Sequence, residues 1–316
     1  MLACFPQRSR APVGPDAAND EFAAWAGARV LLLDDTGNLH SVYRPHTELT
    51  GGLWDVMAGL PSLVPPGPIA MLGLGAGSVP RIIAAHYPTR AAGAGAWSAA
   101  GGGYVVHGWE LDPEVVAAAR RHLGMSQLEA AGQLVVHVGD ALSPAAAVPG
   151  GFSGIVVDLF GGGRLLPQLT KRAAWEDIRS RLSDGGAGSS TPSGSGSGCC
   201  CRLLANLGQS PPTTPGQAGR WQPEAYTTLR AYEALEAAFE GEVSLMTVGG
   251  NTLALTGPLP SPEEWPGRLP AALREQLLFG LDGCAAGGAG GGGPQGGCWA
   301  RDVYPLQRVV VDLSLW

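Results

Sequence analysis

The feature that most constrains this chain is a glycine-rich turn between an apolar run and a helix-forming segment. Residues 69–77 read IAMLGLGAG, with Gly73, Gly75 and Gly77 in the turn. Glycine lets a backbone bend sharply and lets a ligand approach without a Cβ in the way. A dinucleotide-binding fingerprint has glycines at its first, third and sixth positions, whereas here the sixth position is Ser78. The turn is therefore a candidate ligand site, although a turn of this kind does not by itself show that a ligand binds.

Two helix starts can be read directly from the residues. Ser78 follows the turn and is a residue type that caps helices, with a proline tolerated two residues later. The second start is stronger, because Asp112 supplies an N-cap, Pro113 the first helical residue and Glu114 an acid in the first turn. Gly124 is a typical stop for this second helix. Both helices follow strand-like runs directly, as in βα units.

Strand-like and helix-like segments alternate through the middle of the chain, which is typical of a parallel, doubly wound sheet. Strands are predicted at residues 28–34, 39–44, 69–72, 104–110, 133–138, 152–158, 202–207, 242–248, 251–256 and 309–313. Helices are predicted at residues 54–60, 78–86, 112–123, 168–182 and 223–239, with one short helix within 258–278. The predicted fold class is α/β: a Rossmann-like, mostly parallel, seven-stranded sheet with a C-terminal antiparallel hairpin strand, plus a small N-terminal β-hairpin.

Composition divides the chain into a main domain with additions. Forty-nine glycines in 316 residues are far more than the usual share of about 7%, so much of the chain is expected to be loop. Low-complexity insertions are predicted at residues 91–103, 183–198 and 209–219, inside a main domain at 67–258. The remaining parts are an irregular N-terminus at 1–27, a hairpin and helix extension at 28–66, and a C-terminal extension at 259–316 with a Gly-rich segment at 285–297.

Charge and cysteine content exclude several classes of protein. A net charge of −7 argues against a general nucleic-acid binder, whose binding face is basic. No apolar run approaches the roughly 20 residues of a membrane span, so no membrane partner is expected. The six cysteines contain no CxxC pair, which predicts no metal site and a reducing compartment. The expected location is the cytoplasm, or a plastid if Arg8 and Arg10 belong to a short transit segment.

Acidic residues follow the predicted parallel strands at the points where these strands end. In such a sheet, ligands bind beyond the carboxyl ends of the strands. Glu110 lies 33 residues after Gly77, or 20 without the insertion, which is near the ~20 expected of an acid that binds ribose hydroxyls. Asp140 is placed to meet an adenine amine, or else forms an Asx turn. Asp158 closes the next strand, over the space where a transferred group would lie.

These segments together resemble the spermidine-synthase-like branch of the class I S-adenosylmethionine-dependent methyltransferases. The resemblance runs from about residue 29 to residue 256. Its motifs are VLLLDDTGNLHSVY, MLGLGAGSVPRII, HGWELDPEVVAAARRHLG, VHVGDAL and FSGIVVDLF. The combination is specific, whereas any one piece is not.

The resemblance implies a set of cofactor-binding residues and a cofactor. The cofactor is S-adenosylmethionine or its decarboxylated form. The glycine turn would approach the methionine part, Glu110 would take the ribose hydroxyls, and Asp140 with Ala141 would lie beside the adenine. The implied cofactor-binding set is Gly73, Gly75, Gly77, Ser78, Glu110, Leu111, Asp140 and Ala141.

The chain departs from the aminopropyltransferase pattern at the acceptor side. The family places an acid after the last glycine, where this chain has Ser78, and a second aspartate where it has Gly161. A polyamine carries several charges, and each unpaired charge taken from water costs on the order of several kcal/mol. With Ser78 in place of the acid, an intact methionine carboxylate is not repelled. Asp158 is the candidate catalytic base, and Tyr43 and His46 are candidate substrate-binding residues.

Three functional hypotheses follow, with different expected partners. The first is a transferase that binds S-adenosylmethionine and methylates a small molecule or a protein. The second is a polyamine aminopropyltransferase that uses decarboxylated S-adenosylmethionine. The third is a non-catalytic binding module that keeps the fold. A homodimer is compatible with each of them, and neither nucleic acid nor membrane is an expected partner.

Several other side chains receive structural interpretations. His107 and His137 are expected to be satisfied sheet residues, and the run Cys199 to Cys201 is expected to be small packing residues. The residues Trp175, Trp221 and Tyr226 are expected to pack against the sheet.

Overall fold

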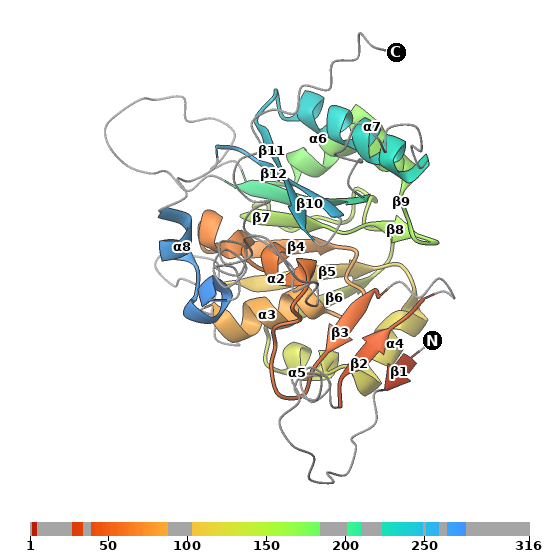
Figure 1. Cartoon of the computed structure of the whole chain (residues 1–316), viewed down its shortest axis with the longest axis vertical. Coiled ribbons are helices and arrows are strands. Elements are labelled where there is room, and N and C mark those ends of the chain that lie inside the picture. The colour runs from red at the N-terminus through yellow and green to blue at the C-terminus, as the bar shows by residue number, and fades with distance from the viewer. Residues whose placement is uncertain are drawn as a thin grey trace, which may run out of the picture.

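A computed structural model gives the fold of the chain (Figure 1). It describes residues 2–4, 27–33, 39–87, 103–183, 201–209, 223–248, 251–258 and 264–275. The insertions, apart from residues 103, 183 and 209 at their edges, lie outside the described residues. The same holds for residues 35–38 and 249–250, which join predicted strands, and for the segment 285–297 and the predicted strand at 309–313. Trp221 and the cysteines other than Cys4 and Cys201 also lie outside the described residues.

A seven-stranded sheet forms the centre of the molecule. Its strand order is β11-β12-β10-β7-β4-β5-β6. The parallel strands are β4 (Pro68–Leu72), β5 (Val105–Glu110), β6 (Leu134–Val138), β7 (Gly154–Val157) and β10 (Arg202–Gln209). The hairpin strands are β11 (Val243–Val248) and β12 (Asn251–Thr256), and β12 runs antiparallel to β10. The predicted Rossmann-like α/β fold with its antiparallel C-terminal strand is confirmed.

Alternate residues of the central strands face two separate apolar cores. Ile69 and Met71 of β4 point to one core. It contains residues of the helices α2 (Leu53–Met57), α3 (Ser78–His86), α4 (Pro113–His122), α5 (Met125–Ala130) and α8 (Glu264–Arg268). Ala70 and Leu72 point to the other core, which contains residues of α6 (Arg172–Ser180) and α7 (Pro223–Ala238). Because side chains of a strand alternate between the two faces of the sheet, an uninterrupted apolar strand requires cover on both sides. The helices in Figure 1 supply this cover.

The helices begin and end close to their sequence signals. Their bounds are α2 Leu53–Met57, α3 Ser78–His86, α4 Pro113–His122, α5 Met125–Ala130, α6 Arg172–Ser180, α7 Pro223–Ala238 and α8 Glu264–Arg268. The side chain of Asp112 accepts from the backbone N–H of Glu114 at 2.8 Å, which confirms the predicted cap of α4. Gly124 has φ +75 between α4 and α5, as a helix stop requires. Among the described helices, none is long and apolar enough to cross a membrane.

A second, three-stranded antiparallel sheet packs beside the glycine turn. Its strands are β1 (Leu2–Cys4), β2 (Arg29–Leu31) and β3 (Ser41–Tyr43), in that order. Val30, Leu31 and Val42 of this sheet belong to the same apolar core as α3 and α4. The predicted N-terminal hairpin is confirmed, and the sheet is thus continuous with the packing of the main domain.

Several local predictions were wrong. Residues 1–27 are not wholly irregular, because β1 pairs with β2. The predicted helix at 54–60 ends at Met57 and is followed by the 3-10 helix η1 (Leu60–Leu63), whose proline suits such a short turn. The predicted helix at 168–182 divides into η3 (Pro167–Thr170) and α6. The hairpin β8 (Phe160–Gly161) and β9 (Arg164–Leu165) and the helix α5 were not predicted.

Candidate functional site

The three glycines of the turn all have a backbone conformation that favours glycine, and two of them are also closely packed against the rest of the protein. Their φ angles are +88 at Gly73, +52 at Gly75 and +80 at Gly77, a region in which other residues are strained. A Cβ at Gly73 would lie 2.1 Å from the carbonyl oxygen of Asp158, and one at Gly75 would lie 2.8 Å from Oγ of Ser41. The nearest atom to a Cβ at Gly77 would be the Met125 methyl carbon at 3.6 Å, an ordinary contact, so only its φ favours glycine there. The role of the three glycines in binding a cofactor stays a prediction, because the backbone conformation, and at Gly73 and Gly75 also close packing, already explains them.

The backbone N–H groups of the turn donate to neighbouring protein groups. Those of Gly73 and Leu74 donate to the carbonyl of Trp109, at 3.2 and 2.8 Å. That of Gly75 donates to Oε2 of Glu110 at 2.9 Å, and that of Ala76 donates to Oγ of Ser41 at 2.8 Å. The turn is consequently fixed between the ends of β4 and β5 on one side and β3 on the other.

Glu110 is held in place by two backbone donors. Its Oε2 accepts from Gly75 and its Oε1 accepts from the N–H of Asp112 at 3.1 Å. An ionised carboxylate has about four acceptor positions, so one position on each oxygen is left for further donors. A carboxylate with its plane fixed and two acceptor positions remaining suits the two hydroxyls of a vicinal diol.

Asp140 lies beside Glu110 at the same edge of the sheet. The backbone N–H of Gly139 donates to the carbonyl of Glu110 at 2.9 Å, which joins the ends of β5 and β6. Oδ1 of Asp140 accepts from the N–H of Leu142 at 2.8 Å, so the residue forms an Asx turn. Leu111 is 71% exposed next to this edge. Its side chain therefore offers an apolar surface against which a flat ring could pack. Ala141 is buried, and its carbonyl accepts from Arg181 at 2.7 Å.

Ser78 does not cap α3, which corrects the sequence prediction. It is the first helical residue, and Gly77 occupies the cap position. The Ser78 hydroxyl accepts from the N–H of Val42 at 2.9 Å and donates to the carbonyl of Val42 at 3.1 Å. Ser78 is buried, so its side chain joins the turn to β3, and its role toward a cofactor stays a prediction.

In the described structure, neither Tyr43 nor His46 forms a hydrogen bond with Asp158. The guanidinium of Arg81 lies 4.8 Å from the centre of the Tyr43 ring, and that of Arg29 lies 5.7 Å from it. Burial lowers the pKa of Arg81 to about 10, so it stays charged at neutral pH. His46 is exposed after β3. Substrate binding by these two residues is untested, whereas the Tyr43 ring has a packing role that the sequence did not reveal.

Asp158 directly follows β7 at the centre of the sheet and is partly buried. Its backbone N–H donates to the carbonyl of Leu72 at 2.8 Å, and its Oδ1 accepts from Nδ2 of Asn206 at 3.0 Å. Burial raises the pKa of Asp158 to about 6, and hydrogen bonds from Asn206 and Trp54 oppose this rise. A carboxyl group that titrates near neutrality is suited to accept a proton.

The raised pKa of Asp158 predicts that the difference in stability between the wild-type protein and Asp158→Asn depends on pH. Its pKa in the folded chain is about 6, above the ~3.9 expected when unfolded. Deprotonation therefore costs stability as the pH rises from 4 to 7. We expect that Asp158→Asn gains free energy of unfolding relative to the wild-type protein over this window. Urea unfolding of both proteins at pH 4, 5, 6 and 7 measures it, and a constant difference across this range would contradict the expectation.

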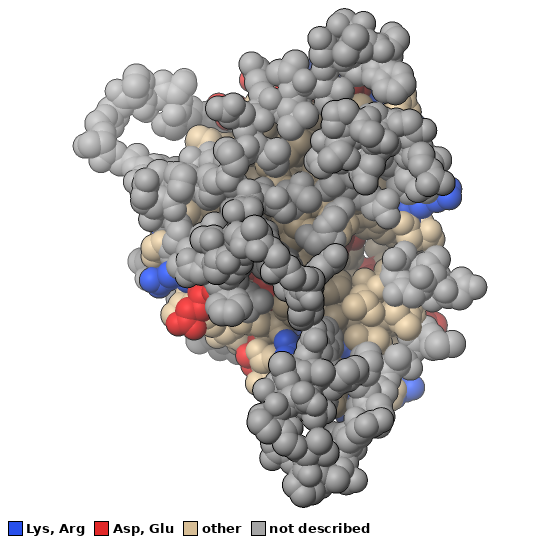
Figure 2. All heavy atoms as spheres, in the orientation of Figure 1, with Lys and Arg blue, Asp and Glu red and all other residues tan. Residues whose placement is uncertain are grey.

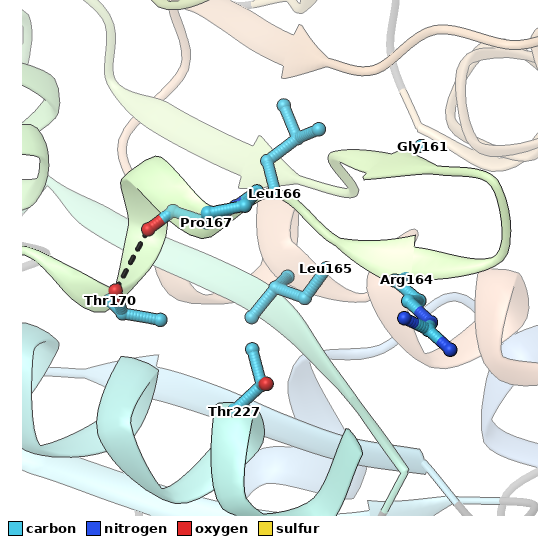
Figure 3. Close-up of a pocket in the computed structure, with 7 residues that line it drawn as sticks. All are labelled: Gly161, Arg164, Leu165, Leu166, Pro167, Thr170 and Thr227. Atoms are coloured by element: carbon cyan, nitrogen blue, oxygen red, sulfur yellow. Dashed lines mark hydrogen bonds between the residues drawn. The ribbon is translucent and has the colours of Figure 1, made fainter. Parts of the chain in front are cut away.

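A cavity of about 340 Å³ lies behind the β8–β9 hairpin (Figure 3). Leu165 of β9 and Thr227 of α7 point toward one another across it, with Arg164 beside them. Gly161, which stands where the family pattern has a second aspartate, also lines it. The cavity thus has a basic side chain and, among the described residues that line it, no carboxylate.

A cluster of aromatic rings lies on β5 and β6, within three residues of the acidic edge. Nδ1 of His107 and Nε2 of His137 are 3.2 Å apart, and the Trp109 and His137 rings stack with centres 4.4 Å apart. Burial and then His137 lower the pKa of His107 to about 4, and burial lowers the pKa of His137. Both rings are therefore neutral at pH 7, and they are satisfied sheet residues as predicted.

Other structural interpretations have mixed outcomes. Trp175 is fully buried as predicted, whereas Tyr226 is 59% exposed, so its expected packing against the sheet was wrong. Cys201 is partly buried and free, with its sulfur 2.9 Å from the Ser183 hydroxyl. In the described part of the chain, no group of three or more His, Cys, Asp or Glu residues could hold a metal ion. Figure 2 shows basic and acidic side chains next to one another at the left of one face.

The sheet order, the glycine turn after β4 and the acidic end of β5 define the class as a Rossmann-like α/β methyltransferase fold. The resemblance to its spermidine-synthase-like branch is confirmed at the level of the fold. A probable spermidine synthase from Corynebacterium glutamicum superposes with a TM-score of 0.52 at 15% sequence identity, over 84% of this chain and 95% of that chain.

Two further solved structures have lower scores. The spermidine synthase from Thermotoga maritima gives a TM-score of 0.48 at 12% identity, over 75% of this chain and 72% of that one. An O-methyltransferase family protein from Burkholderia thailandensis gives 0.40 at 12% identity, over 65% of this chain and 54% of that one. No family model matches the sequence, and no curated protein matches it.

Proposed function

We propose that this protein is an S-adenosylmethionine-binding transferase that methylates a small-molecule or protein acceptor. The observation that carries the proposal is the carboxylate of Glu110, held beside the glycine turn by the N–H groups of Gly75 and Asp112. Two acceptor positions remain on this carboxylate for the ribose hydroxyls of the cofactor. Exposed Leu111 and the neighbouring Asp140 provide an edge on which the adenine would rest.

The acceptor side favours methyl transfer over aminopropyl transfer. Where an aminopropyltransferase would carry an acid to bind the cofactor amine, this chain has the uncharged Ser78, whose hydroxyl bonds to β3. The second acceptor-binding aspartate is replaced by Gly161, and the neighbouring cavity contains Arg164. A polycationic acceptor would leave its charges unpaired in such a site, which is costly.

The chain's own residues would bind the cofactor and accept a proton. When bound, S-adenosylmethionine would supply a methyl group to the acceptor heteroatom, and the electron pair of the broken C–S bond would stay on its sulfur. Asp158 accepts the proton that the acceptor heteroatom loses. Because the pKa of Asp158 is raised to about 6, its carboxylate is largely ionised at pH 7 and is still basic enough to take up the proton.

A ligand titration tests the proposal directly. Calorimetry and thermal unfolding are measured with S-adenosylmethionine, its decarboxylated form and NAD. At about 100 times the dissociation constant, the true ligand adds roughly 2.7 kcal/mol to the free energy of unfolding. We expect S-adenosylmethionine to bind most tightly. Tighter binding of the decarboxylated form, together with methylthioadenosine made from putrescine, would instead establish an aminopropyltransferase. Absence of binding by all three would contradict the proposal.

Glu110→Gln is expected to weaken S-adenosylmethionine binding by about tenfold to a hundredfold. The substitution removes one charge-assisted acceptor, and hydrogen bonds to charged groups contribute about 1.5–3 kcal/mol. The new amide group would also face one of the two backbone donors that hold Glu110. Glu114→Gln is the matched control, because Glu114 is an exposed carboxylate in the first turn of α4. Calorimetry should give the control the wild-type affinity, and equal affinities for both variants would refute the role of Glu110.

A further inference from the structure

Asn206 lies beside Asp158, within the neighbouring strand β10. Its Nδ2 is 3.0 Å from Oδ1 of Asp158, and its Oδ1 accepts from the backbone N–H of Gly208 at 3.0 Å. The side chain is 5% exposed. It therefore joins the candidate base to the backbone of the next strand inside the core, and sequence reasoning did not single it out.

The orientation of the Asn206 amide is fixed by chemistry. A backbone N–H can only donate, so the amide oxygen of Asn206 must face Gly208 and its NH₂ group must face Asp158. The pairing of β10 with β12 shifts register between Asn206 and Gln209, and Gly208 has φ +90 at this irregularity. Bulges of this kind re-aim side chains, and here the bulge turns the Gly208 N–H toward the asparagine two residues earlier.

We infer that Asn206 is a positioning residue for the proton-accepting carboxylate of Asp158. By donating to Oδ1, it fixes the plane of the carboxylate. The catalytic meaning of this contact rests on the proposed function, whereas the contact itself does not. Trp54 of α2 also hydrogen-bonds to the carboxyl group of Asp158, and among the described residues no charged side chain affects the pKa of Asp158.

Asn206→Leu tests the inference with a side chain of similar size that cannot donate. A hydrogen bond to the ionised form lowers the pKa of a carboxyl group, so its loss should raise the pKa of Asp158 above the wild-type value. The pKa is read in the free protein by ¹³C NMR of labelled aspartate, with Asp158→Asn used for assignment. Thr256→Val is the matched control, because it removes another buried hydrogen bond to β10, from the Leu203 N–H, without contact to Asp158.

The expected result is a raised pKa in Asn206→Leu and a wild-type pKa in the control. We also expect kcat to fall by about tenfold to a hundredfold, as misplacement of a reacting group does, with unchanged affinity for S-adenosylmethionine. Asn206→Asp covers the case in which the leucine variant does not fold, because its carboxylate still accepts from Gly208. The added like charge should then raise the apparent pKa of the aspartate pair.

The outcomes separate this inference from the proposed function. An unchanged Asp158 pKa in a folded Asn206 variant would overturn the positioning role, even if the wild-type protein transfers methyl groups. A raised pKa with the control unchanged supports the contact, even if the wild-type protein binds no S-adenosylmethionine. In that case the transferase proposal fails, and with it the catalytic meaning of the contact.

Discussion

Replacing Asp158 by asparagine is expected to lower the rate of methyl transfer by about 10²- to 10⁴-fold, the usual contribution of a general base. Asparagine has the same shape and can still accept from Asn206 through its amide oxygen, so the fold should be kept. It cannot accept the proton that the acceptor loses. The affinity for S-adenosylmethionine should not change, because Glu110 and the glycine turn provide the expected contacts of the cofactor.

The rate is measured as formation of S-adenosylhomocysteine with acceptors from a fractionated cell extract. Glu176→Gln is the control, because Glu176 is an exposed carboxylate of α6 that pairs with Arg172. Its rate should equal that of the wild-type protein. For the wild-type enzyme, the rate should also fall as the pH drops through about 6, where Asp158 becomes protonated. A folded Asp158→Asn protein with full activity would remove Asp158 from the mechanism, and unaltered function in cells would favour a non-catalytic binding module.

Gly73→Ala is expected to destabilise the protein by about 2–5 kcal/mol. A left-handed backbone conformation costs a residue with a Cβ about 1–2 kcal/mol, and forcing an atom into a packed interior costs about 1–3 kcal/mol more. The φ of Gly73 is +88, and an added Cβ would lie 2.1 Å from the carbonyl oxygen of Asp158. Because that neighbour is backbone, the ends of β4 and β7 would have to separate, which would also displace the Asp158 carboxylate.

Gly162→Ala provides the matched control for this substitution. Gly162 has φ +57, but an added Cβ would meet nothing within 4 Å. It should therefore lose only the conformational contribution of about 1–2 kcal/mol. Urea unfolding of both variants measures the difference. If Gly73→Ala is no less stable than Gly162→Ala, the close approach between the turn and Asp158 does not restrict this position.

The acidic residues at the carboxyl ends of the parallel strands could be predicted from the sequence. Apolar runs that end in Glu110 or Asp158 identify parallel strands, and the carboxyl ends of such strands meet at one edge. The cap at Asp112 was readable for the same reason, since each of these signals lies within a few residues of the element that it ends. The sequence could also suggest why glycine is needed in the turn, but not that Ser41 and Asp158 are the groups that approach it.

The parts that were missed depend on contacts between distant segments. Asn206 reaches Asp158 only because β10 lies beside β7 and has a bulge opposite β12, and a register shift of this kind has no local signature. The contact between the Tyr43 ring and Arg81 was also missed, because the two residues are far apart in the sequence. Tyr226 fits the helical spacing of α7, yet it lies on the exposed side, since spacing does not show where a helix face ends.

The reciprocal contact between β3 and the glycine turn has a consequence for how this protein can evolve. Ser41 satisfies a peptide group of the turn, and Ser78 satisfies the two peptide groups of Val42 in return. Loss of either hydroxyl would leave a backbone polar group of the other segment without its hydrogen-bond partner, so we expect substitution of either serine to weaken the contact between β3 and the turn. A substitution in β3 therefore restricts which residues the glycine turn can accept, and a substitution in the turn restricts β3 in the same way.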